Sequence, residues 1–159
     1  MPVLSRDGVL RSRVSADPVE TGDSMPNVRL PSDEELVRFS IAWPAGGWTW
    51  DRRYNCVVSS FNAADSGEYE AIVDQVFPSR WDHKTITRAT PELQRVVEGT
   101  QGLRAGQFVS TPKVIAGDFA FVLWWPWGDD ATISARVVLS VESTAIGAAL
   151  RERFEIDEE

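Results

Sequence analysis

Residues 119–142 constrain the fold more than any other part of the chain. Residues 119–125 are apolar throughout, as in a strand buried on both faces, and Pro126 marks their end. After the turn-forming residues 128–130, residues 131–142 alternate apolar and polar side chains, with only Val138 out of pattern. Two strands joined by a short polar turn pair with each other, so the sequence predicts an antiparallel sheet.

Shorter stretches of the chain carry further strand signals. Residues 36–43 and 48–58 alternate on either side of a Pro-Ala-Gly-Gly turn at 44–47, which predicts a half-buried hairpin. Residues 107–110 and 113–116 are two more short candidates, separated by Thr111 and Pro112. The sequence thus supplies strands from both halves of the chain.

Three segments have the signals of helices. One apolar stripe at helical spacing is formed by Tyr69, Ile72, Val73, Val76 and Phe77. A shorter helix is marked by Thr90 as N-cap, Pro91 at its first position and Gly99 after its end. A last helix begins near Ser143 or Thr144. Helices that cluster rather than alternate with strands are typical of the α+β class. We expect an antiparallel sheet of about five to six strands, with two to three helices packed mainly on one face.

The two ends of the chain differ from its middle. Residues 1–32 contain four prolines and little periodicity, which predicts an extended N-terminal arm, flexible or ordered by a partner. Residues 33–154 are expected to form a single α+β domain, and residues 155–159 an acidic C-terminal tail.

Composition narrows the possible partners and the compartment. A net charge of −8 argues against binding to nucleic acid or to an anionic membrane surface. The lone Cys56 and the lack of an apolar signal run near the N-terminus favour a cytoplasmic protein. The charge is uneven, since residues 78–113 carry six basic side chains against three acidic ones. Either ordinary surface solvation or a basic patch for an anionic partner explains this bias.

No motif in the sequence predicts catalysis or cofactor binding. Neither phosphate-binding glycine motif is present, and one histidine with one cysteine excludes a Cys/His zinc site within a single chain. Asp129 and Asp130 are candidate metal ligands, but adjacent acids in a turn usually cap their own backbone. Cys56 and His83 are a possible nucleophile and base that no spacing rule brings together. We therefore expect no catalytic residue, no metal and no cofactor.

The seven tryptophans are the feature that most needs an explanation. Several of them lie at predicted turns, where burial is difficult, and exposed tryptophan is enriched at interfaces. The candidate interface residues are Trp43, Trp48, Trp81, Trp124 and Trp127. The first hypothesis is a non-enzymatic interaction or assembly protein, which uses this tryptophan-rich surface and the arm to bind itself or a partner protein.

Two other hypotheses stay open. One is a small enzyme or ligand-binding domain with an aromatic pocket near Trp81 and His83, to which Trp50, Arg52 and Tyr54 would contribute. Arg52 interrupts an otherwise apolar strand face, either as part of a site or as a strand end that reaches solvent. The other hypothesis is carbohydrate binding through stacked tryptophan.

Overall fold

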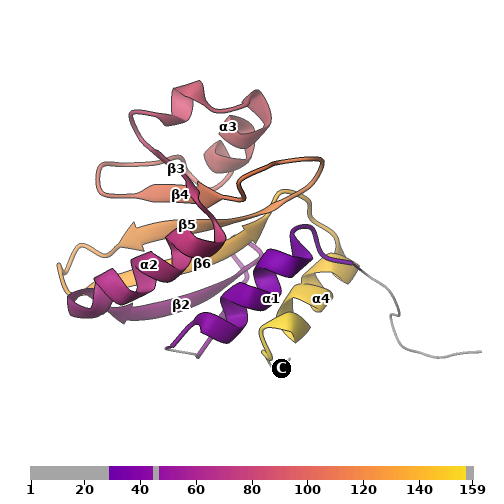
Figure 1. The fold of residues 1–159 in the computed structure, drawn as a ribbon, viewed down its shortest axis with the longest axis horizontal. Helices are drawn as coiled ribbons and strands as arrows, with labels where there is room; N and C mark the ends of the chain where they lie inside the picture. Colours follow the sequence, from indigo (N-terminus) through magenta and orange to yellow (C-terminus); the bar gives the residue numbers. More distant parts are fainter. Residues whose placement is uncertain (1–28, 45–46, 157–159) are drawn as a thin grey trace, which may run out of the picture.

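The computed structural model describes residues 29–44 and 47–156, and its strands form one antiparallel sheet (Figure 1). The strands are β1 Thr49–Asp51, β2 Cys56–Asn62, β3 Ser79–Asp82, β4 Phe108–Thr111, β5 Ala120–Pro126 and β6 Thr132–Leu139. Their order across the sheet is β1-β2-β6-β5-β4-β3, and every neighbouring pair is antiparallel. The predicted hairpin of residues 119–142 is confirmed and lies at the centre of the sheet.

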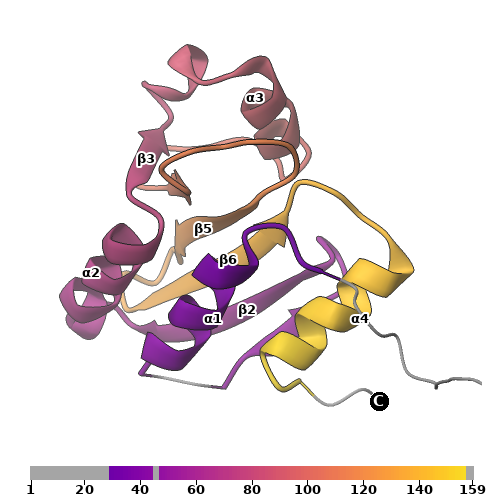
Figure 2. The same cartoon turned by 45° about the vertical axis from the view of Figure 1, so that its right-hand side comes forward.

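The helices are distributed unequally over the two faces of the sheet. They are α1 Asp33–Ala42, α2 Ser66–Val76, α3 Pro91–Glu98 and α4 Thr144–Arg153, with short 3₁₀ turns at η3 Ala63–Asp65 and η4 Ile86–Arg88. Helices α1, α2 and α4 lie on one face, as Figures 1 and 2 show, and α3 packs on the other. The predicted α+β class, with an antiparallel sheet and helices mainly on one face, is confirmed.

The helix starts follow the predicted capping chemistry. The Thr90 hydroxyl oxygen accepts a hydrogen bond of 3.2 Å from the Leu93 N–H, and Pro91 occupies the first turn of α3. At α4, the Ser143 hydroxyl oxygen accepts a bond of 3.1 Å from the Ile146 N–H. Each cap satisfies a backbone donor that has no partner within its own helix, so these boundaries were readable from sequence.

An aromatic cluster fills the space between the sheet and the three helices of the first face. The ring of Trp43 lies 4.7 Å from Tyr69, 4.9 Å from Phe39 and 5.7 Å from Phe61. Its Nε1–H donates a 3.0 Å hydrogen bond to the Ser59 hydroxyl oxygen. The polar atom of a buried indole is therefore satisfied, and helix α1 is tied to strand β2.

One predicted strand is wrong. Residues 36–43 form most of helix α1 and its C-terminal cap, and the hairpin predicted around residues 44–47 does not exist. Leu36, Phe39 and Trp43 are buried and share one helical face, whereas Ile41 is 79% exposed. Acidic side chains occupy the first turn of α1, where their negative charges interact favourably with the positive end of the helix dipole and stabilise the helix. That helical signal was present beside the misleading alternation.

The following run also folds differently from the prediction. Residues 48–58 do not form one strand, because β1 ends at Asp51 and the chain turns through residues 52–55 before β2 begins. Asn55 takes a positive φ of 52° in this turn, a conformation that asparagine tolerates better than most residues. Residues 113–116 are not a strand, and edge strand β3 was missed.

Packing against the core begins before residue 33. Leu30 is buried, and the Ser32 hydroxyl oxygen accepts a 3.1 Å hydrogen bond from the Ala120 N–H. At the other end Ile156 packs against the first-face core. The rest of the predicted arm and of the predicted tail lies outside the described residues.

Phe39 and Ile41 provide a direct test of the helical assignment. As alternate positions of a strand they would share one face, but on α1 they lie on opposite sides. Phe39→Ala is expected to lower the free energy of unfolding by about 3–5 kcal/mol, because it empties a buried aromatic site. The matched change Ile41→Ala is expected to stay within about 0.5 kcal/mol. Urea denaturation followed by circular dichroism measures both values, and equal losses would contradict the assignment.

Candidate functional site

Helix α3 covers only part of the second face of the sheet. Leu93 and Val97 of α3 pack with Val109, Phe121 and Leu123 of β4 and β5. Along β2 the cover is lost: Cys56 is buried, Val58 is half-buried, and Ser60 and Asn62 are exposed. The exposed and half-buried residues of this region are Tyr54, Val58, Ser60, Trp125, Trp127 and Arg136, and Ser134 is buried beneath them. We call this region the Trp125 surface.

Arg136 organises one end of the Trp125 surface. Its guanidinium lies 4.4 Å from the Trp125 ring centroid and 5.9 Å from that of Tyr54. Its Nε–H donates to the Asp51 carboxylate at 3.4 Å, and the two side chains are only 11% and 14% exposed. Pairing with Asp51 compensates the loss of hydration, so the cation stays fixed against the indole face.

Trp127 marks the other end of the surface. It is 51% exposed, although its Nε1–H donates a 2.7 Å hydrogen bond to the Ser134 hydroxyl oxygen. The Ser134 hydroxyl is in turn 2.8 Å from that of Ser60. The polar atom of Trp127 is thus held by the sheet, while much of its ring remains in water.

The two turns that flank the surface carry opposite charges. Arg52 and Arg53 are exposed in the β1–β2 turn, and Arg53 lies 5.0 Å from the Tyr54 ring centroid. In the β5–β6 turn, Asp129 accepts hydrogen bonds from the backbone of Ala131 and from Thr132, which keep its pKa below the ordinary value. The antiparallel register of β2 with β6 puts the two turns at opposite ends of this strand pair.

Two of the predicted interface tryptophans are core residues. Trp43 is 5% exposed in the aromatic cluster, and Trp124 is 4% exposed, stacked on Phe108 at 5.1 Å. Their expected surface position is wrong. Trp43 follows a helix rather than a strand, and Trp124 points to the helix-covered face, which leaves Trp125 as the outward member of the pair.

The other three predicted tryptophans differ in exposure. Trp48 is half-buried, with its ring 4.7 Å from Phe154. Trp81 is half-buried on β3. Trp127 alone of these three is a large exposed side chain. The Nε1 atoms of Trp48, Trp81 and Trp125 are buried and find no acceptor among the described residues.

The predicted pocket residues do not come together. Arg52 and Tyr54 lie in the turn beside β1, whereas Trp81 belongs to β3, the strand at the opposite edge of the sheet. His83 follows β3 and is exposed. Arg52 does not interrupt a strand face, because it is an exposed turn residue. Sequence reasoning missed Arg136, although its place on the polar side of the clearest alternating run could have indicated it.

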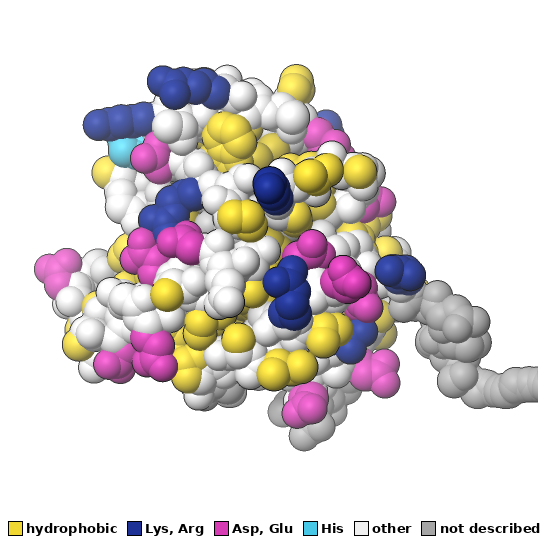
Figure 3. Space-filling model, viewed as in Figure 1, with side chains coloured by type: hydrophobic (Ala, Val, Ile, Leu, Met, Phe, Trp, Pro, Cys, Tyr) yellow, Lys and Arg dark blue, Asp and Glu magenta, His cyan; other side chains and the backbone are white. Residues whose placement is uncertain are grey.

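The basic bias of residues 78–113 has a structural part and an exposed part. Arg80 pairs with Glu70 at 2.8 Å and Asp74 at 2.7 Å, and lies 3.8 Å from the Phe108 ring centroid, so it joins β3 to α2. The other five basic side chains are exposed: Lys84, Arg88, Arg95, Arg104 and Lys113. Figure 3 shows basic side chains over the segment between β3 and α3, and acidic ones across the helices below.

The residues that could carry chemistry are dispersed. Within residues 29–44 and 47–156, no group of three or more His, Cys, Asp or Glu side chains gathers to hold a metal ion. None of the described helices is long and apolar enough to cross a membrane. No protein-family model, no curated protein and no solved structure matches this chain.

The thiol of Cys56 is predicted to be unreactive in the folded protein. Burial, followed by the nearby charge of Asp51, raises its pKa to about 12, so at pH 8 the thiolate is scarce. Labelling by a disulfide reagent at pH 8 is expected to be about a thousandfold slower in the native protein than in urea. The native rate should still rise from pH 8 to pH 10 without a plateau. Rapid native labelling would contradict the position of Cys56.

Proposed function

We propose that this chain is a non-enzymatic assembly protein, which pairs with a second copy of itself through the Trp125 surface. The observation that carries the proposal is the exposed ring of Trp127, on a sheet surface flanked by oppositely charged turns. An exposed tryptophan that is already held by a hydrogen bond loses little side-chain freedom on binding. Such fixed aromatic side chains are typical centres of protein interfaces.

The charges favour a second copy over an unrelated partner. A two-fold axis through the surface would bring the arginine turn of one copy to the aspartate turn of the other. Arg52 and Arg53 would then face Asp129 and Asp130, and Trp127 of each copy would lie against the Tyr54 end of the other. One patch thereby supplies both halves of a complementary interface. A different protein as the partner is the competing outcome of the experiment below.

The proposal also includes two expectations from the sequence. Residues 1–32, with their four prolines, are proposed as a second tie between copies. A cytoplasmic location is proposed because the chain has one cysteine, which forms no bridge within the chain and is buried.

The solution mass, measured by light scattering on a sizing column, tests the self-pairing. The wild-type chain is expected to form a dimer at micromolar concentration. Trp127→Ala removes the exposed ring and is expected to weaken the dimer by about 30-fold or more, since such truncations cost roughly 2 kcal/mol or more. Ile41→Ala, which removes an exposed apolar side chain from α1, is the matched control and should leave the mass unchanged.

Charge reversal tests the orientation of the two copies. Arg52→Glu and Asp130→Lys should each weaken the dimer, and the double variant should restore part of it, because the opposite charges meet again. A monomeric wild type would refute self-pairing. A partner recovered through the same Trp127-dependent surface would then indicate a different protein. A chain that lacks residues 1–28 tests what the arm contributes to the dimer. The deletion ends before Leu30 and Ser32, because these two residues pack within the fold.

A further inference from the structure

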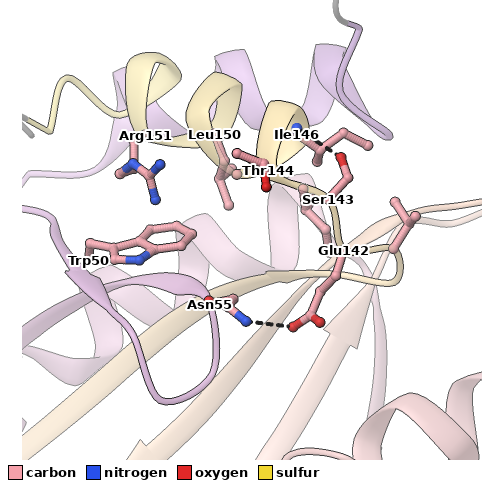
Figure 4. A pocket seen from close by; sticks show the side chains of 11 residues that line it. Trp50, Asn55, Glu142, Ser143, Thr144, Ile146, Leu150 and Arg151 are labelled. Carbon is pink, nitrogen blue, oxygen red and sulfur yellow. Dashed lines mark hydrogen bonds between the residues drawn. The ribbon is translucent and has the colours of Figure 1, made fainter.

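A cavity of about 420 Å³ lies between helix α4, the end of β6 and the β1–β2 turn (Figure 4). Trp50 of β1 forms one wall, and Asn55 and Glu142 line the side away from α4. Pockets for small molecules commonly begin at about 300 Å³ and combine apolar walls with a few placed polar groups. None of the tryptophans predicted for an interface lines this cavity.

The apolar wall is built where α4 crosses the sheet. Leu139 and Leu150 are buried at its base, and Ile146 is half-buried beside them. A Cβ atom at Gly147 would lie in ordinary van der Waals contact with the Trp50 ring, at 3.8 Å, and with the Arg151 guanidinium, at 3.9 Å. The absence of a side chain at Gly147 therefore leaves space that the cavity occupies.

The polar side of the cavity contains both donors and acceptors. The Asn55 amide N–H donates a 2.9 Å hydrogen bond to the Glu142 carboxylate and so fixes its direction. The remaining lone pairs of Glu142, the Asn55 carbonyl and the Thr144 hydroxyl complete this side. Ser143 is already used as the cap of α4.

The cavity carries one charge of each sign. Arg151 lies 4.4 Å from the Trp50 ring centroid at one end, and the Glu142 carboxylate lies at the other. A ligand with a net charge would be attracted by one of these groups and opposed by the other. A neutral ligand with several hydroxyl groups is opposed by neither charge, and its hydroxyls can donate to the Glu142 carboxylate.

We propose that this cavity binds a neutral polyhydroxylated ring of the monosaccharide or cyclitol class. The C–H face of such a ring suits Trp50 and the leucine wall, and its hydroxyl rim suits Glu142, Asn55 and Thr144. The proposal does not depend on self-pairing, since Trp50, Ile146 and Leu150 of the lining pack on the helix-covered side of the sheet, and only Asn55 comes from the turn that flanks the Trp125 surface.

The test is binding to wild-type protein, measured by saturation-transfer NMR and calorimetry. The neutral probes are glucose, galactose, N-acetylglucosamine and myo-inositol, and the charged probes are glucosamine and glucuronate. At least one neutral probe is expected to bind with a dissociation constant below about 10 mM, more tightly than either charged probe. Binding of charged probes alone, or of no probe, would overturn the proposal.

Variants assign any binding to the cavity. Trp50→Leu removes the aromatic wall, and Gly147→Leu fills the space while leaving that wall in place. Each variant is expected to weaken binding of the neutral probe by about tenfold or more, or to abolish it. Glu142→Gln retains the size of the side chain but removes its charge. Its affinity for the neutral probe is expected to fall several-fold. Trp127→Ala is the control and should bind as the wild type does.

Circular dichroism checks that each variant folds. If Trp50→Leu fails to fold, Gly147→Leu still provides a decisive test. Binding that is unchanged in both Gly147→Leu and Glu142→Gln would exclude this cavity. Because Trp127→Ala should weaken pairing but leave sugar binding unchanged, failure of one proposal is distinguishable from failure of the other.

Discussion

The architecture depends on the way in which Trp43 joins α1 to the sheet. Its indole donates to Ser59 on β2 and contacts Tyr69 on α2, so one side chain fixes three elements. A buried indole N–H without an acceptor would cost about 1–3 kcal/mol, and Ser59 removes that cost. With α1 held there, Phe39 is buried in the core, and the helices shield the first face of the sheet from solvent.

The unequal cover of the two faces produces the two candidate binding regions. Three helices fill the first face, and the edge where α4 meets β1 leaves the Trp50 cavity. On the second face, the core around the short α3 extends to Val138 of β6 and Cys56 of β2 but leaves Ser60 and Trp127 exposed in the Trp125 surface. Arg136 and Asp51 make that surface rigid, because neither charge can leave the other without an uncompensated desolvation cost.

The errors of the sequence interpretation have one physical origin. A short segment such as residues 36–43 satisfies a two-residue and a 3.6-residue period equally well when apolar residues are dense. Packing on the sheet favours the helix, which buries Phe39 while leaving Ile41 in water, and the acidic first turn of α1 agrees with it. The same limit applies to Trp124 and Trp125, since alternation says that they face opposite sides but not which side the helices cover.

The sequence by itself determined the α+β class, the central hairpin of β5 and β6, and the caps at Thr90 and Ser143. Those features rest on local periodicity and on hydrogen bonds between neighbours in the chain. The tertiary structure decided which tryptophans reach solvent, that Arg136 stacks on Trp125, and that Trp50 borders a cavity with Glu142. These features join residues that are distant in sequence, and only the order and register of the strands bring such residues together.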